Sequence, residues 1–582
     1  MTAETPAPPP ARPTLRGTRH MVAAGHTMAA QAGLQVLEAG GNAVDAAAAA
    51  GIATAVLEPE FVTFAGVAPI LIYLAAKREI VTISGLGPWP RAASCDYFNE
   101  HHGGAIPPGP LRSVVPAAPD AWITALERYG TMSFGEVAAA AIRFAGEGFP
   151  VYPTLANMIA DHEESYAAWP TTAAIFLSQG RPPGVGELFV QDDLGCMLRF
   201  LADEEASHAG KGREAGLDAV RRAFYRGDVA AAIVKFHEEN DGLMTAADLA
   251  DFRVGVEPPV KTTFGDVEVY GCGPWCQGPM LLQELNLVEG LNLATMGHNT
   301  SAYIHSLTEA IKLAAADRDA YYGDPRFVDV PMDALLDKDY AAKRRELIRD
   351  GEAWIDRPPP GGVGGTPWPG PSEATAASGT LSAETQSGLD TSYLCVIDRW
   401  GNAVSATPSD GSTNDPIVPG TGFFLSPRGL SAWTDPDHPC SIMPGKRPRL
   451  TPNPALAIRP GETIMPFGTP GGDVQTQAML QVFLNIFIFG MELQAAVEAP
   501  RFASYGFPSS FEPHDSHPGR ISLESRIAEE VGAALSGWGH DVNWWPEFIY
   551  LAGSVCAIGK SEATGILHGA ADPRRAAYAS GW

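Results

Sequence analysis

The stretch Thr391-Ser-Tyr-Leu-Cys-Val-Ile-Asp398 decides the fold, because it combines the pattern of a buried strand with an unusual setting. Its aromatic, β-branched and apolar residues predict a strand. Residues 399–402 predict a turn, and residues 403–407 predict a second strand that completes a hairpin. Upstream, residues 358–371 include six prolines and five glycines, and residues 372–390 are small and polar. We therefore expect residues 358–390 to form a flexible linker that ends at Thr391.

A threonine at the end of a flexible linker has a specific chemical use. If the peptide bond before Thr391 is cut, the new α-amine lies beside the threonine hydroxyl. An α-amine has a pKa near neutrality, so it can act as the general base that activates this hydroxyl. Composition alone favours a simpler interpretation, in which an interdomain linker enters an ordinary strand. The sequence around the threonine must decide between the two.

The composition of the chain excludes several classes of function. The chain has 582 residues, 40 basic and 67 acidic side chains, a formal charge of −27 and 45% hydrophobic residues. The apolar fraction is sufficient for a folded core, which excludes a wholly disordered chain. The acidic balance argues against nucleic acid and against an anionic membrane surface, because both attract clustered Lys and Arg. No apolar stretch reaches the roughly 18 residues that a transmembrane helix needs.

The first residues and the cysteines indicate the compartment. Residues 1–18 are rich in Pro and Ala and lack the apolar region of a secretory signal, so we expect a disordered leader. The seven cysteines are few and scattered, which suits a reducing, cytoplasmic location. Cys272 and Cys276 lack a second pair of ligands. We interpret them as buried thiols in a turn, and we expect neither a metal nor a cofactor.

The sequence that starts at Thr391 resembles the start of the small subunit in the gamma-glutamyltransferase (glutathione hydrolase) family. Members of that family are made as one chain that cuts itself before a threonine. Other stretches match the family's motifs in the same order, namely Gly40–Ala46, Glu58–Pro59, Tyr129–Met132, Tyr322–Pro325, Gly445–Pro448, Thr469–Gly472, Ala499–Phe502 and Asp572–Arg574. Their order and spacing extend the resemblance over almost the whole chain.

The resemblance implies an α/β fold, the four-layer αββα sandwich of the N-terminal-nucleophile hydrolases. Residues 19–357 would form the large subunit core, residues 358–390 the linker up to the cleavage site, and residues 391–582 the small subunit. This single sandwich replaces the roughly four domains that chain length suggests. The implied partners are the two subunits of one precursor and a small-molecule amide substrate. Association of such heterodimers into a homo-oligomer stays open.

The resemblance also implies roles for individual residues. Thr391 would attack the peptide bond to Asp390 in the precursor and a substrate amide in the mature enzyme. Gly471 and Gly472 match the turn whose backbone N–H groups form the oxyanion hole, where the absence of a side chain permits close approach. Ser409 lies at the position of a second hydroxyl that hydrogen-bonds the nucleophile. The local pattern departs from the family here, so Thr407 is an alternative.

Three departures concern the residues that bind the γ-glutamyl group in the family. Leu86 lies at the position of an arginine that clamps the substrate α-carboxylate, and Arg91 would substitute for it only in a rebuilt loop. Ser431 lies at the position of an aspartate that binds the α-amine. Leu450 and Thr451 lie at the positions of two serines that bind the carboxylate. A charged head group without partners costs several kcal/mol, so this combination indicates a changed substrate.

The sequence therefore predicts a self-cleaving amidohydrolase or acyltransferase whose acyl group is not γ-glutamyl. Family members include class IV cephalosporin acylases and an enzyme that hydrolyses oxamate. The apolar Leu86 and Leu450, with Arg91 and Arg449 close by in the sequence, favour a small or carboxylated acyl amide. Two alternatives stay open: a genuine γ-glutamyl hydrolase or transpeptidase with a rebuilt pocket, and a homologue that cannot cut itself and serves in binding.

Overall fold

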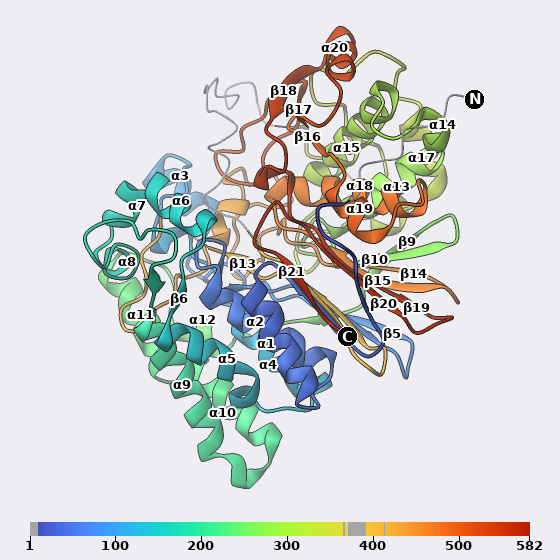
Figure 1. Ribbon diagram of the computed structural model, residues 1–582. Helices are drawn as coiled ribbons and strands as arrows, with labels where there is room; N and C mark the ends of the chain where they lie inside the picture. The colour runs from blue at the N-terminus through green and yellow to red at the C-terminus, as the bar shows by residue number, and fades with distance from the viewer. Residues whose placement is uncertain (1–9, 365–366, 371–390, 412–413) are drawn as a thin grey trace.

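The computed structural model describes residues 10–364, 367–370, 391–411 and 414–582. These residues form the implied αββα sandwich, in which two antiparallel seven-stranded sheets lie between two groups of helices (Figure 1). The first sheet has the order β1 (Leu15–Gly17), β20 (Leu567–Ala571), β19 (Cys556–Ser561), β15 (Thr463–Gly468), β14 (Ala455–Arg459), β10 (Val267–Gly271) and β9 (Val260–Phe264). The second has the order β21 (Tyr578–Gly581), β2 (Met21–Ala24), β11 (Leu394–Ile397), β12 (Ala403–Ala406), β4 (Ile70–Leu74), β5 (Glu79–Ile83) and β8 (Val256–Glu257).

The predicted hairpin is confirmed as β11 and β12, in the middle of the second sheet between β2 and β4. Side chains of β11 alternate between two buried layers. Cys395 and Ile397 pack in the cluster between the sheets, whereas Leu394 and Val396 belong to the cluster beneath the helices. Burial on both faces explains why this stretch is a continuous apolar run.

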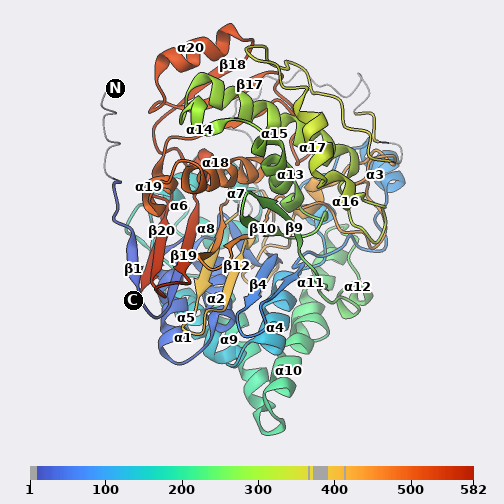
Figure 2. The ribbon, with the colours of Figure 1, turned by 90° about the vertical axis from the view of Figure 1, so that its right-hand side faces the viewer.

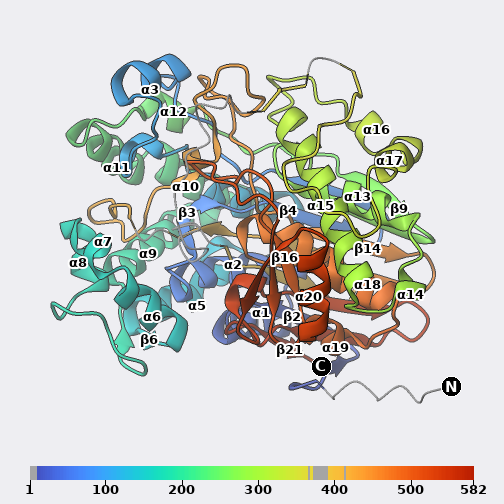
Figure 3. The same cartoon turned by 90° about the horizontal axis from the view of Figure 1, so that it is seen from above.

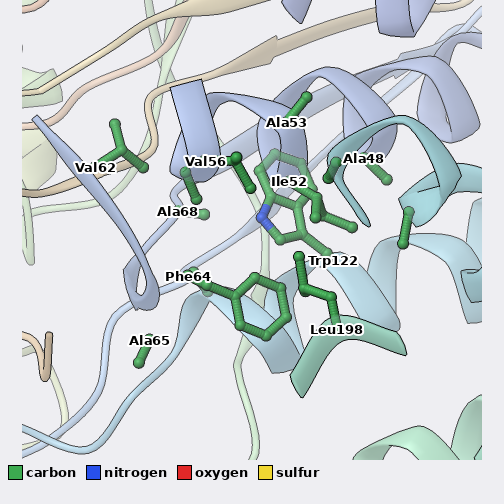
Figure 4. Packing of buried hydrophobic residues seen from close by; sticks show 14 of the residues in the cluster. Ala48, Ile52, Ala53, Val56, Val62, Phe64, Ala65, Ala68, Trp122 and Leu198 are labelled. Carbon is green, nitrogen blue, oxygen red and sulfur yellow. The ribbon is translucent and has the colours of Figure 1, made fainter. Parts of the chain in front are cut away.

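Helix α2 (Ala43–Leu57) covers the hairpin from the other side and is buried along its whole length. Asn42 and Asp45 form a capping box at its start. Its many alanines and Gly51 allow close packing, and Figure 4 shows Trp122 of α4 (Ala118–Tyr129) lying against it. A Cβ on Gly51 would lie 2.2 Å from Trp122 Cζ2. The small residues of α2 therefore make room for this indole.

The outer face of the first sheet is covered by α13 (Gly278–Glu289), α15 (Ser301–Tyr321), α18 (Gln475–Phe487) and α19 (Leu493–Glu498). Seen from above, this group lies on the opposite side of the molecule from helices such as α9 (Asp192–Ser207) and α11 (Asp228–Glu239) (Figure 3). Thr300 caps α15, because its hydroxyl accepts from the backbone N–H of Tyr303. None of the described helices is long and apolar enough to cross a membrane.

The prediction of a disordered leader over residues 1–18 is wrong for its last part. Residues 15–17 form β1, which pairs with β20 at the edge of the first sheet (Figure 2). Just before β1, the backbone N–H groups of Ala11 and Arg12 donate to the Glu498 carboxylate. Glu498 is nearly 500 residues away in sequence and β20 is farther, so the local composition could not reveal these partners. Residues 1–9 lie outside the described residues.

The prediction of a flexible linker is also wrong for the residues of 358–370 that the structure describes. Trp368 is buried against the rings of Trp433 and His438, and its indole N–H donates to Asp435 at 2.9 Å. The N–H of Gly361 donates to Asp317 at 2.8 Å. The aromatic side chain anchors a segment whose Pro and Gly content alone predicts mobility. Residues 365–366 and 371–390 lie outside the described residues.

Candidate active site

The structure brings together the two hydroxyls that the sequence predicts. Thr391 forms an antiparallel bridge with Ser409, and its Oγ1 lies 2.8 Å from Ser409 Oγ. The N–H of Ser392 donates to the Pro408 carbonyl at 2.9 Å, which fixes the backbone on both sides of this contact. Thr407 does not make this contact, and its buried Oγ1 has no hydrogen-bond partner among the described residues. Ser409 rather than Thr407 therefore faces the Thr391 hydroxyl.

A buried arginine that the sequence analysis missed lies behind Ser409. Arg428 begins the short helix η5 (Arg428–Ser431) and is fully buried. Its Nη2 donates to Ser409 Oγ at 2.7 Å, and its Nε donates to Asp410 Oδ1 at 2.8 Å. Asp410 also accepts a hydrogen bond from Ser426 Oγ. A continuous chain of polar contacts thus runs from Arg428 through Ser409 to Thr391.

The predicted oxyanion-hole glycines form a turn at the end of β15. Gly468, the last residue of β15, packs against the Tyr393 ring so closely that a Cβ would lie 2.3 Å from Cε2. Gly471 and Gly472 follow with φ values of +123° and +56°, which are strained for any residue with a side chain. Gln277 Nε2 donates to the Gly472 carbonyl at 2.9 Å. The contact with Tyr393 ties the turn to the segment that carries Thr391.

Two buried glutamates, Glu58 and Glu60, lie close to the segment that carries Thr391. Ser392 Oγ donates to Glu58 Oε2 at 2.6 Å, and Tyr152 donates to Glu60 Oε1 at 2.5 Å. Burial raises the pKa of Glu60 to about 8, with the nearby Glu58 carboxylate adding to the effect. Arg575 approaches from the C-terminal part of the chain, and its Nη1 donates to the Thr391 carbonyl at 3.2 Å. Residues 391 and 392 are therefore held by one contact from the N-terminal part of the chain and one from the C-terminal part.

The predicted substrate-binding residues Leu86 and Leu450 share one fully buried apolar cluster. Its other members are Val67, Cys272, Trp275 and Cys276. Burial raises the pKa of the Cys272 thiol well above its ordinary value, which disfavours the thiolate that a metal would need. The positions to which the resemblance assigns charged contacts are thus surrounded by hydrocarbon and thiol side chains.

The two predicted arginines already have acidic partners. Arg91 has a largely exposed side chain and donates to Asp251 at 2.8 Å, at the end of α12 (Ala246–Ala250). Arg449 is buried and lies 3.2 Å from Asp319. Arg91 therefore does not lie in a buried pocket with Thr391, because its loop keeps the side chain at the surface. Arg449 is inside the protein, but its charge is already balanced.

Several buried donors near η5 lack hydrogen-bond partners among the described residues. They are Ser431 Oγ, Trp89 Nε1 and Trp433 Nε1. Trp89 packs in one cluster with Ala432, so it belongs to the same neighbourhood as Ser431. Thr451 differs from these residues because its hydroxyl has a partner: Oγ1 accepts from Arg428 Nη1 at 3.4 Å. Buried donors without partners are costly, so this region suits a ligand with acceptor oxygens.

One group of described side chains has the chemistry of metal ligands. His305, Glu309 and His540 are buried, with ligand atoms within 4.8 Å of one another. However, Lys312 Nζ lies 2.6 Å from Glu309 Oε1, and His305 Nδ1 lies 2.8 Å from His540 Nε2. Burial lowers the pKa of His540 to about 3, so this imidazole is neutral. The lysine ammonium already balances the Glu309 carboxylate, and the cluster is best described as an internal ion-pair network.

Comparison with known proteins gives consistent results over the whole chain. A family model described as gamma-glutamyltranspeptidase matches residues 29–582. The Acylase ACY 1 proenzyme of Pseudomonas sp. (strain SE83) is 33% identical over 555 residues, which cover 93% of this chain and 90% of that protein.

Two solved structures share the fold at nearly full length. The structure titled LmbA2991HD has a TM-score of 0.91 and 36% identity, and the match covers 98% of this chain and all of that one. The cephalosporin acylase from Bacillus halodurans has a TM-score of 0.83 and 29% identity, with 100% and 98% of the two chains covered. The likeness therefore includes both sheets and both helical layers.

Proposed function

The chain belongs to the gamma-glutamyltranspeptidase family of N-terminal-nucleophile hydrolases, which act on amide bonds, and on that premise we propose its cleavage site and its substrate. The chain cuts itself before Thr391 and then hydrolyses an amide whose acyl group is not γ-glutamyl. The observation that carries this proposal is the 2.8 Å contact between Thr391 Oγ1 and Ser409 Oγ. This contact supports the proposal because it pairs two buried hydroxyls at the position where the family has its nucleophile.

Processing and turnover use the same hydroxyl. In the precursor, Thr391 Oγ attacks the carbonyl carbon of Asp390, the C–N bond breaks and an ester forms. Water hydrolyses this ester and leaves a carboxylate on Asp390 and a free α-amine on Thr391. In the mature enzyme the hydroxyl attacks the substrate amide, and the α-amine passes the proton to the leaving nitrogen. Water, or an acceptor amine, then releases the acyl group.

The oxyanion that forms in each attack needs hydrogen-bond donors. Gly471 and Gly472 are proposed to supply them, because their turn follows the strand that packs on Tyr393. Both are glycines with positive φ, so the turn adopts this conformation without strain and no side chain blocks the backbone N–H groups. Donors fixed in this manner stabilise the developing charge without reorganisation.

The lining residues support an acyl group without an α-ammonium. Ser431 replaces the aspartate that binds this ammonium in the family, and Leu86 and Leu450 provide a buried apolar surface. An ammonium that enters such a site without an anionic partner costs several kcal/mol. The unpartnered donors Ser431, Trp89 and Trp433 suit carbonyl or carboxylate oxygens instead. A small or carboxylated acyl amide, such as oxamate or a cephalosporin side chain, fits both properties.

A denaturing gel tests self-cleavage. Purified wild-type protein is expected to give fragments of 390 and 192 residues, and Thr391→Ala is expected to give one band of 582 residues. Thr391→Ser, which keeps a hydroxyl, serves as the matched control and should still be cut. A wild-type chain that stays intact after long incubation would instead support a binding homologue.

A matched pair of anilides tests the acyl group. A glutaryl anilide differs from a γ-glutamyl anilide only in lacking the α-ammonium. We expect kcat/KM for the glutaryl compound to be higher by at least about tenfold, which corresponds to roughly 1.4 kcal/mol. A butyryl anilide then shows whether the carboxylate is recognised. Preference for the γ-glutamyl compound would support a γ-glutamyl enzyme with a rebuilt pocket.

A further inference from the structure

We propose that Arg428 is a positioning residue that orients the Ser409 hydroxyl as a hydrogen-bond donor to Thr391 Oγ1. This inference rests on the proposed function of Thr391 as the nucleophile. The contacts that carry it are Arg428 Nη2 to Ser409 Oγ at 2.7 Å and Ser409 Oγ to Thr391 Oγ1 at 2.8 Å. All three residues are at least 99% buried. The two contacts share one oxygen, so the arginine acts on the nucleophile through the serine.

The direction of the hydrogen bonds follows from the chemistry of the groups. A guanidinium can only donate, so Ser409 Oγ accepts from Arg428. A hydroxyl oxygen that accepts from a cation becomes a weaker acceptor and a stronger donor. The Ser409 proton is therefore directed to Thr391 Oγ1, where it stabilises the negative charge that develops as this oxygen loses its own proton. In the opposite direction Ser409 Oγ would accept from both Arg428 and Thr391, and it would then offer nothing to the charge that develops on Thr391 Oγ1.

Asp410 holds the arginine in this position. It accepts from Arg428 Nε and Nη2, so the planar guanidinium is fixed by two bonds while Nη2 reaches Ser409. Asp410 has a φ of +86°, which is uncommon for a residue with a side chain, and its other carboxylate oxygen accepts from Ser426. Because Asp410 directly follows Ser409, the same ion pair fixes both the backbone and the hydroxyl of the serine. A lysine offers one point charge and cannot reproduce this fork.

A double-mutant cycle on the rate of self-cleavage tests the coupling. The variants are Arg428→Met, Ser409→Ala and the double variant, and the readout is the first-order disappearance of the uncut chain. Each single change is expected to slow cleavage by about 10²-fold, as removal of a positioned proton-transfer or donor group does. The double variant should be no more than about threefold slower than either single variant, because the two residues act as one unit. Arg428→Lys should cut itself less than about tenfold faster than Arg428→Met.

The control is Arg221→Met, which removes another buried arginine that is paired with an aspartate, Asp120 on α4. It is expected to lower the melting temperature in the same way while cleavage stays within threefold of wild type. If Arg428→Met does not fold, Arg428→Gln replaces it, since an amide can still donate to Ser409 without a charge. Single effects that multiply in the double variant would overturn the inference. A wild-type chain that does not cut itself would instead overturn the proposed function.

Discussion

At the scale of single residues, Glu60 links the protein's stability to pH. The carboxyl is buried next to Glu58, and its pKa is raised from 4.5 to about 8. Because the folded-state pKa is above the unfolded one, the stabilising contribution is full below pH 4.5. It is then lost as the pH rises towards about 8, at up to roughly 1.4 kcal/mol per pH unit.

Glu60→Gln should remove this dependence, because the amide oxygen can still accept from Tyr152 without becoming charged. The variant is expected to melt close to wild type at pH 5 and at a higher temperature at pH 8.5. Thermal melts from pH 5 to 9 measure the difference, with the exposed Glu100→Gln as control. A difference that does not change with pH would contradict the assignment.

The residues of the site differ in how well the sequence predicts them. The contact between Thr391 and Ser409 could be expected because the resemblance assigns the two positions to a pair of hydroxyls, whereas composition alone favoured an ordinary strand. Arg428 could not, because it follows no motif and its partners lie 18 or 19 residues away. The only local signal was a charge three residues after the apolar residues 423–425, where burial requires a partner. Arg91 was predicted from its distance in sequence alone, and its side chain turned out to face Asp251 at the surface.

At the scale of elements, α2 depends on a glycine that no local rule requires. A Cβ at Gly51 would lie 2.2 Å from the Trp122 indole, which is rigid and enclosed. Gly51→Ala is therefore expected to destabilise the protein by about 1–3 kcal/mol, as overpacked cores do. Gly146→Ala in α5 (Phe134–Glu147) is the matched control, because nothing lies within 4 Å of its added Cβ. That change should stabilise by roughly 0.5–1 kcal/mol, and chemical denaturation measures both. Equal effects of the two substitutions would refute the packing argument.

Elements form where the local pattern is strong. The hairpin predicted from residue 391 onward is present as β11 and β12. Residues 70–74, 79–83 and 267–271, which are rich in apolar and β-branched side chains, form strands, and Thr300 caps the long helix α15. The errors fall on segments whose conformation depends on distant partners. β1 needs β20, and the buried Trp368 needs Trp433, and neither partner can be inferred from the neighbouring sequence.

At the scale of the whole molecule, the segments before and after Thr391 cannot form independent domains. β11 and β12, which follow Thr391, are hydrogen-bonded on one side to β2 and on the other to β4, which precede it. The first sheet is mixed in the same way, since β14 pairs with β10. Chain length suggests several domains, but the pairing of distant strands makes one.

The processed protein should therefore elute in size-exclusion chromatography as one species that contains both fragments. Its mass is expected to be 61.5 kDa or a multiple of it, and the two fragments should unfold in one shared transition in urea. Analysis of each fraction on a denaturing gel gives the measurement. Separate elution of the two fragments without denaturant would contradict the interleaved sheets.

The position of the last residue next to the first strands has a consequence for protein engineering. The Trp582 carbonyl accepts from the backbone N–H of Arg19, and a Cβ on Gly17 would lie 2.7 Å from the Trp582 carbonyl carbon. A short peptide could therefore join residue 582 to residue 15 at the start of β1, and a circularly permuted gene could begin at Thr391 and end near residue 364. Removal of the initiator methionine would then expose the threonine amine at once. Such a permutant would separate the chemistry of self-cleavage from that of turnover in a single polypeptide.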